Sequence, residues 1–290
     1  MINRRKEAAQ GFLYILPSLV LILVFSVVPI LMSLYFSFTK YNVLQPPQWT
    51  GLDNYIRLFR DPYVRASLKN TVVFTVITVP LQTAGSLVLA AVIAELFHNK
   101  FGNFVKSSLF VPVIASAILV GTLWFTLLSP RGVVNSIINV FGRPSVNWLG
   151  GKLTSMLSVC IVSVWKNVGY FLVIYFAGIM DIPRSLYEAA EVDGANAFQR
   201  FFKITLPGLS SVTFLVVTLG TIWSFQVFDL VYTMTGGGPG TSTVTLVLTT
   251  YNAAFKEYNM GYASAVAMLM FVLVLAVSGL QKLLLKGGED

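Results

Sequence analysis

Residues 181–207 read DIPRSLYEAAEVDGANAFQRFFKITLP and concentrate charged side chains in a chain that is otherwise poor in them. The stretches on both sides are apolar enough to lie in lipid. Charged side chains are costly inside a bilayer, so a charged segment between two apolar runs is expected to return to water. Residues 181–207 therefore predict a loop between two membrane spans.

This loop carries the signals of two short helices. Pro183 suits the first position of a helix, and Ser185 and Glu188 have the spacing of a capping box. Gly194 ends this helix, and Asn196 can cap a second one. On the second helix we expect an aromatic face formed by Phe198, Phe201 and Phe202. Pro207 is expected to end this helix. The pattern predicts a helix pair bent at Gly194 on the membrane surface. An amphipathic hairpin that packs on its own bundle is the alternative.

The composition is that of a membrane protein. Of the 290 residues 56% are hydrophobic and 11% charged, whereas soluble domains carry about 25% charged residues. The basic residues are spread over short loops, so the net charge of +8 indicates membrane-flanking charge and no nucleic-acid partner. A single cysteine, Cys160, excludes an internal disulfide, and with a single histidine, His98, no His/Cys metal cluster can form.

The apolar runs are each long enough to cross the hydrocarbon, which takes ~20 helical residues. They lie at about 11–38, 68–96, 107–128, 153–178, 209–230 and 260–281. Six spans place both termini on one side, and the basic N-terminus favours the cytoplasm. We predict an all-α polytopic membrane protein with one transmembrane domain over residues 1–290 and a cytoplasmic loop at 181–207.

No motif for nucleotide binding or catalysis is found. A P-loop needs G-x-x-x-x-G-K-[ST], and Gly150-Gly151-Lys152 lacks the upstream glycine and the following hydroxyl. The glycines of 236–240 precede no lysine and are interpreted as a turn between spans. We expect no catalytic residue, no metal site and no cofactor bound by this chain. Uphill transport would then draw its energy from a partner or an ion gradient.

Polar and aromatic residues within the expected spans are candidates for a substrate path, because each polar group is costly in lipid. A tryptophan ring can stack on the C–H face of a sugar, while amides and carboxylates bind hydroxyls. The candidates are Trp165, Lys166, Asn167, Trp223, Gln226 and Asp229. Packing explanations stay open: Gln226 and Asp229 could bond to neighbouring helices, Asp229 could pair with Lys166, and the tryptophans could be interfacial.

Glu188-Ala189-Ala190, followed by Gly194 and by Ile204-x-Leu206-Pro207, resembles the EAA loop of permease subunits of ABC importers. In that family the loop docks into a cleft of the ATP-binding subunit and transmits the ATPase cycle to the membrane. The resemblance thus implies an ATPase-coupling role for Glu188, Ala189, Ala190, Asp193, Gly194, Phe198, Ile204, Leu206 and Pro207.

Other segments resemble maltose- and lactose-type sugar permeases. These are Trp49-x-Gly51-Leu52-x-Asn54-Tyr55, the stretch from Phe228 to Pro239, and Met260-Gly261-Tyr262-Ala263. The resemblance implies a type I ABC importer permease in a bacterial or archaeal plasma membrane, forming half of a path for di- or oligosaccharides. Its implied partners are a different, homologous permease, two ATP-binding-cassette subunits that hold ATP and Mg²⁺, and an extracytoplasmic sugar-binding protein.

The sequence leaves three other functions to compare with this one. An ABC permease for glycerol 3-phosphate or another small solute would want basic residues in the path, and Lys166 is the candidate. An ion-coupled secondary transporter usually shows inverted repeats and broken helices, and no such symmetry is seen in the sequence. A membrane enzyme lacks a catalytic set.

Overall fold

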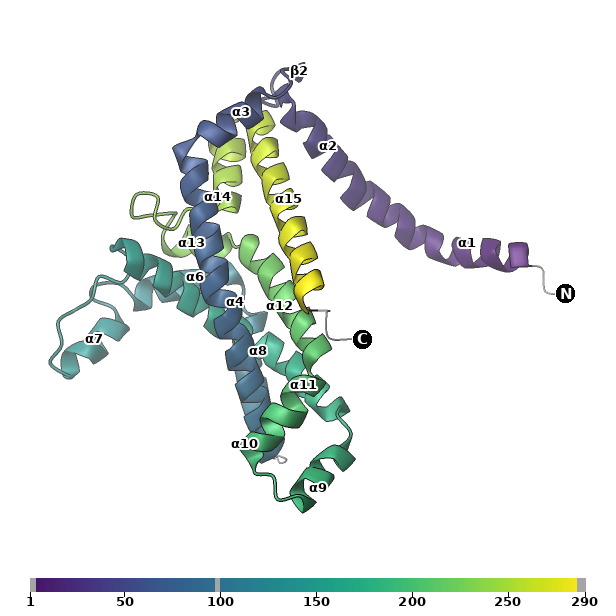
Figure 1. The fold of residues 1–290 in the computed structure, drawn as a ribbon. Helices are drawn as coiled ribbons and strands as arrows, with labels where there is room; N and C mark the ends of the chain where they lie inside the picture. Colours follow the sequence, from purple (N-terminus) through teal and green to yellow (C-terminus); the bar gives the residue numbers. More distant parts are fainter. Residues whose placement is uncertain (1–3, 97–99, 286–290) are drawn as a thin grey trace. The chain divides into compact units, whose positions relative to one another are not determined.

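The computed structural model describes residues 4–96 and 100–285, and their regular secondary structure is helical apart from one short pair of strands (Figure 1). The chain divides into two compact units, Met1–Asp61 with Thr250–Leu269, and Pro62–Thr249 with Met270–Asp290. Within the described residues, four helices are long and apolar enough to cross a membrane. Two bent helix pairs would bring the number to the six expected from the sequence.

The first unit begins with a long apolar helix. It consists of α1 (Arg4–Ile22), the π-helical turn η1 (Leu23–Val27) and α2 (Val28–Ser37). The π turn comes directly before Pro29, which cannot donate a backbone hydrogen bond and crowds the carbonyl four residues earlier. A wider turn at this point accommodates the proline without ending the helix. In the most apolar window of the span Phe12–Ser37, no residue is buried.

A small cap follows α2. Its elements are β1 (Thr39–Lys40), β2 (Gln48–Trp49) and α3 (Asp53–Arg60). The strands pair antiparallel, and the side-chain amide of Asn54 donates to the carbonyls of Ser37 and Thr39, both at 2.9 Å. The carbonyl of Ser37 ends α2 and that of Thr39 belongs to β1, so this amide supplies donors at the point where the helix passes into the strand.

The first turn of α15 (Met260–Leu285) closes onto this cap. A Cβ on Gly261 would lie 2.0 Å from the carbonyl oxygen of Thr39, so only glycine permits this approach. The hydroxyl of Tyr262 donates to the carboxylate of Asp61 at 2.6 Å. Two segments singled out in the sequence, near residues 49–55 and 260–263, are therefore parts of one packed structure.

The second unit is a helical bundle. Its long elements are α4 (Pro62–Leu96), α5 (Lys100–Ile114), α6 (Ala117–Leu127), α8 (Lys152–Asp181) and α12 (Ser210–Phe225), with the shorter α7 (Val133–Val140). Helix α4 packs along both α8 and α12 (Figure 1). The core between them includes the fully buried Phe171, Leu172, Tyr175 and Val216. Small residues of α4 allow the close approach, since Ser86 and Ala90, four residues apart on one face, are fully buried.

Two of the expected spans are broken. The run 107–128 belongs to α5 and α6, which meet at 97° across a short break at Ser116. The run 209–230 ends as α12 at Phe225, and α13 (Asp229–Met234) follows after a non-helical link. Hydropathy averages over such breaks, because both arms of a bent helix are equally apolar.

The segment rich in glycine is an ordered structure tied to α4. The elements after it are α14 (Leu246–Tyr251) and the π-helical turn η3 (Asn252–Lys256). The amide of Asn70 on α4 donates to the carbonyls of Thr241 at 2.7 Å and Val244 at 3.0 Å. Gly237 adopts a φ of +94°, a conformation that a residue with a Cβ rarely takes. The segment is a turn, as the sequence indicates.

Candidate functional site

The segment between α8 and α12 folds as two short helices, as the sequence predicts. Helix α9 spans Arg184–Val192 and α10 spans Ala197–Arg200. Gly194 lies between them with a φ of +78°, in the left-handed region that favours glycine. No atom lies within 4 Å of the position where its Cβ would be. The bend at Gly194 is therefore set by backbone conformation and not by a crowded contact.

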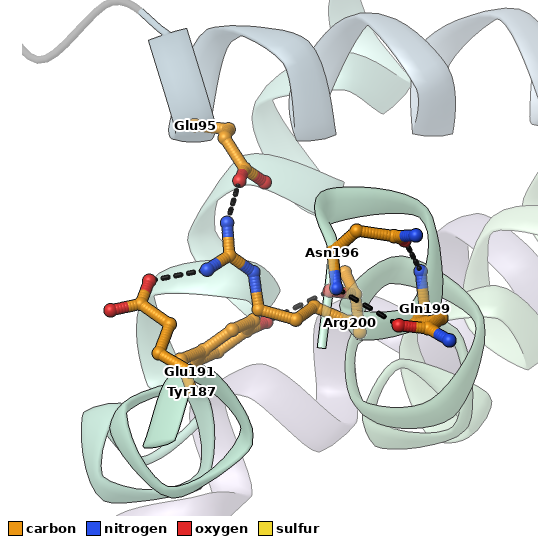
Figure 2. Close-up of polar contacts among 7 residues, drawn as sticks. Glu95, Tyr187, Glu191, Asn196, Gln199 and Arg200 are labelled. Carbon is orange, nitrogen blue, oxygen red and sulfur yellow. Dashed lines mark hydrogen bonds and ion pairs between the residues drawn. The ribbon is translucent and has the colours of Figure 1, made fainter. Parts of the chain in front are cut away.

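A capping box begins α10. The side-chain oxygen of Asn196 accepts from the backbone N–H of Gln199, and the Gln199 side-chain oxygen accepts from the backbone N–H of Asn196, both at 2.9 Å (Figure 2). These bonds satisfy backbone donors that a helix start leaves free. The predicted cap at Asn196 is confirmed.

Two details of the expected helix pair are wrong. Pro183 is the cap of α9, with an extended ψ of 126°, and the helix begins at Arg184. Ser185 then lies inside the first turn, and α9 has no side-chain cap, so no Ser185–Glu188 capping box forms. Pro207 does not end the second helix. The π-helical turn η2 (Phe201–Thr205) accommodates it, the short α11 (Leu206–Gly208) continues, and the chain bends by 69° into α12.

Polar contacts hold the segment in place (Figure 2). Arg200 forms ion pairs with Glu191 on α9 and with Glu95 near the end of α4. The hydroxyls of Tyr187 and Thr205 are hydrogen-bonded at 2.9 Å, which ties α9 to η2. Helices α9 and α10 contain no buried residue. The position of these helices therefore depends on polar contacts rather than on a buried apolar face.

Two clefts adjoin the segment. One, of about 400 Å³, lies among the ends of α4 and α8 and the two short helices, and its lining includes Glu95, Arg184, Glu188, Glu191 and Arg200. The other, of about 490 Å³, includes Ile204 and Pro207 in its lining. The first cleft brings both signs of charge together in a small volume.

The segment also exposes apolar side chains. Val192 is 89% exposed and Phe198 is 70% exposed. Leu186 and Phe202 are about half exposed, and the rings of Phe198 and Phe202 are in contact, with centroids 4.5 Å apart. Figure 1 shows α10 beside the lower end of α4 and α9 beyond that end. Apolar groups gathered at the end of a bundle mark a surface that another protein or a membrane can cover.

The expected coupling residues fall into two groups in the structure. Those on the two helices and the bend are accessible, fully or in part: Glu188, Ala189, Ala190, Asp193, Gly194 and Phe198. Ile204 and Leu206 are half-buried, and Leu206 packs against the core of the bundle. Pro207 is exposed. The first group can meet a partner, while Leu206 anchors the segment to the bundle.

The expected substrate-path residues come from two parts of the chain, α8 and the region of α12 and α13. The ring of Trp165 packs edge-on against Trp124, with centroids 5.5 Å apart. The ammonium of Lys166 donates to the carbonyl of Val113 at 3.3 Å, and the amide of Asn167 reaches Ser163 Oγ at 3.5 Å. All three therefore have neighbours within their own part of the bundle.

The remaining candidates are on α12 and α13. Trp223 packs on Tyr170 and Phe171, with centroid distances of 4.8 and 5.4 Å. Gln226 is exposed at the end of α12, and Asp229 is exposed in the first turn of α13, where a carboxylate suits the helix dipole. Asp229 and Lys166 do not form an ion pair. No hydrogen bond or ring contact among the described residues joins these candidates to Trp165, Lys166 or Asn167.

Sequence reasoning missed the partnership of Arg200 with Glu95 and Glu191. Both Glu95 and Arg200 are charged residues beside apolar runs, which is a signal that each has a partner. The sequence could not show that residues so far apart in the chain meet.

The chain is similar in sequence to known membrane components of transport systems. The family described as "binding-protein-dependent transport system inner membrane component" matches residues 8–287. A probable ABC transporter permease protein of Bacillus subtilis, YurN, is 36% identical, with 100% of each chain covered. The trehalose/maltose transport system permease protein MalF of Thermococcus litoralis is 34% identical, covering 93% of this chain and 92% of the relative.

The fold also matches a solved structure. The crystal structure of a bacterial ABC transporter involved in the import of the acidic polysaccharide alginate contains a chain with a TM-score of 0.86, 24% identity and 98% coverage of both chains. At this identity the likeness establishes the fold. The family match over nearly the whole sequence and the 36% identity to YurN show that this chain belongs to the inner-membrane components of binding-protein-dependent transport systems, the permeases of ABC importers.

Proposed function

We propose that this chain is a permease subunit of an ATP-driven importer of di- or oligosaccharides. It forms half of the translocation path, makes no covalent bond, and is driven by a separate ATPase through residues 184–207. The chain is placed in the plasma membrane of a bacterium or archaeon. The observation that carries the proposal is that the segment from α9 to η2 follows the EAA pattern and exposes Val192 and Phe198 at the end of the bundle.

The coupling role rests on what these two helices offer. They bury no residue against their own bundle, so their apolar side chains are available to a partner. The bend at Gly194 and the cap at Asn196 give the pair a defined shape, which docking into a cleft requires. The alternative of a hairpin packed on its own bundle is disfavoured, because such a hairpin would bury an apolar face.

Other subunits complete the assembly in this proposal. An ATPase pair binds ATP and Mg²⁺ and grips the α9–α10 region. A homologous second permease supplies the other half of the path, as the resemblance to sugar permeases implies. A soluble sugar-binding protein delivers the substrate from outside. ATP-driven closure of the ATPase pair would shift α9 and α10 and open the path outward.

A sugar is favoured over a phosphate ester by the polar groups available. The candidates on α12 and α13 include an aromatic ring, Trp223, and an exposed amide and carboxylate, Gln226 and Asp229, groups that suit the C–H face and the hydroxyls of a sugar. Glycerol 3-phosphate, the alternative solute, would need a free cation. The candidate cation, Lys166, stands without a second basic residue among the candidate path residues, and one of its three donors is directed to the carbonyl of Val113.

Reconstitution tests the proposal. The chain, its second permease and the ATPase are purified as a complex, placed in liposomes with the binding protein, and given labelled maltose, trehalose, lactose, maltotriose and glycerol 3-phosphate with ATP. We expect ATP-dependent uptake of at least one of the sugars. Uptake of glycerol 3-phosphate alone would reject the sugar assignment, and accumulation without ATP would reject coupling to an ATPase.

A further inference from the structure

The largely buried side chain of Arg200 lies between two carboxylates, one on α9 and one on α4 (Figure 2). Its Nη1 pairs with Glu191 on α9 and its Nη2 with Glu95 on α4. The Arg200 side chain is 17% exposed, whereas the two carboxylates are 61% and 41% exposed. We name these three residues the Arg200 bridge. A guanidinium presents its donors in a rigid planar fork, so one arginine can hold two carboxylates at once.

The position of Glu191 favours a cation beside it. Glu191 is the penultimate residue of α9. The C-terminal end of a helix carries partial negative charge, so a carboxylate there is disfavoured by the helix dipole. Arg200 offsets this unfavourable placement and so stabilises the end of α9.

The bridge also connects α9 and α10 to the bundle at a place where no apolar side chain of these two helices is buried. Neither α9 nor α10 contains a buried residue. The Tyr187–Thr205 hydrogen bond stays within the segment, linking α9 to η2. The bridge instead leaves the segment and contacts α4, which itself packs along α8 and α12. The capping box at Asn196 sets the start of the four-residue helix α10 and so the position of Arg200 at its end.

We propose that Arg200 is a positioning residue for energy coupling: its bridge ties α9 to the end of α4, so that a displacement of α9 moves α4 together with the helices on either side of the segment. Without the bridge, α9 would keep its chain connections and its Tyr187–Thr205 hydrogen bond to η2, but it would lose its ion-paired contact with α4. This inference rests on the proposed function for its driving force, but the tie itself belongs to this chain and can be measured on it.

The first experiment measures the tie. In a Cys160→Ala background, spin labels are attached at Val88→Cys on α4 and Val192→Cys on α9, positions that are 53% and 89% exposed. Pulsed electron resonance gives the distance distribution between the labels in the isolated chain in nanodiscs. We expect one narrow distribution in the parent and a broader one in Arg200→Gln and Glu95→Gln. A distribution that both variants leave unchanged would overturn the proposal.

The second experiment measures coupling in the assembled complex with ATPase subunits and binding protein. Sugar uptake and ATP hydrolysis are recorded in the same liposomes. We expect uptake per ATP to fall about fivefold or more in Arg200→Gln, the lower end of typical coupling factors. Arg200→Lys, which keeps the charge but not the fork, should recover part of the loss. Lys152→Gln, which removes an exposed charge from the first turn of α8, outside the segment, is the control and should match the parent.

The two experiments separate the possible failures. If the parent chain neither purifies with an ATPase nor needs ATP, the proposed function fails, and the label distances still decide whether the bridge exists. If the parent is coupled and Arg200→Gln keeps its uptake per ATP, the positioning role of Arg200 is wrong. A variant that is absent from the membrane fraction is replaced by Glu95→Gln, which removes the α4 arm and leaves the Arg200–Glu191 pair.

Discussion

The ammonium group of Lys166 on α8 donates a hydrogen bond to the backbone carbonyl of Val113, 3.3 Å away in the last turn of α5. Carbonyls in the last turn of a helix have no partner within the helix, and positive charge is favourable there. Lys166 therefore stabilises the point where α5 ends and α6 departs at 97°. Lys166, which the sequence makes a candidate for the substrate path, thus also contacts the end of α5 beside the break in this span.

This relationship predicts that Lys166→Met lowers stability more than it changes substrate choice. Loss of a hydrogen bond to a charged group costs about 1–3 kcal/mol. We expect a lower thermal unfolding midpoint for the purified chain in detergent. Lys152→Met, which removes an exposed lysine from the first turn of the same helix, should leave the midpoint unchanged. An unaltered midpoint for Lys166→Met together with lost uptake would return Lys166 to the substrate path.

Two glycines of α15 give a matched pair. A Cβ at Gly261 would lie 2.0 Å from the carbonyl oxygen of Thr39, whereas nothing lies within 4 Å of a Cβ at Gly279. Overpacking typically costs about 1–3 kcal/mol. Gly261→Ala should therefore destabilise the chain, and Gly279→Ala should be neutral or slightly stabilising. Unfolding midpoints of both variants check this, and equal midpoints would show that the cap does not pack on α15 as described.

The bend at Gly194 predicts a graded response. Proline is held near a φ of about −65° and cannot adopt the +78° seen here. Alanine can, at a cost of about 1–2 kcal/mol, and there is open space for its methyl group. We expect Gly194→Pro to abolish uptake with normal amounts in the membrane, and Gly194→Ala to reduce it. Full uptake by Gly194→Pro would show that the bend is dispensable.

Glu188 is an exposed carboxylate in the charged cleft beside α9. Reversing its charge adds a cation to a cleft that already contains Arg184 and Arg200, and it removes an anion from the surface assigned to the ATPase. Glu188→Lys should abolish uptake and weaken copurification of the ATPase, while membrane insertion stays normal. Glu257→Lys, at an exposed site on the first unit, is the control. Undiminished uptake by Glu188→Lys would argue against the role given to α9.

The sequence predicts some parts of this fold well, because the signals are local. Gly194 and Asn196 mark the bend and the second helix start, and each acts on its immediate neighbours. The same reasoning misplaces the start of α9. Pro183 takes the capping position itself, which moves Ser185 into the first turn.

The remaining features depend on contacts between distant residues, which composition and periodicity do not encode. The break between α5 and α6 is invisible to hydropathy, and Lys166 is recognised there only once Val113 is seen beside it. Polarity alone made Lys166 a substrate candidate. The Arg200 bridge likewise joins Glu95 to a helix more than a hundred residues later in the chain, and no local pattern could pair them.

The central claim is that an ATPase grips the segment from α9 to α10. A photo-cross-linking amino acid at Val192 or Phe198, both largely exposed, reports this contact in the assembled transporter, with Val140 on α7, 83% exposed, as the control position. The account predicts a cross-linked product with the ATPase subunit from residues 192 and 198 and none from residue 140. An assembled, active transporter that gives no such product from either position would contradict it.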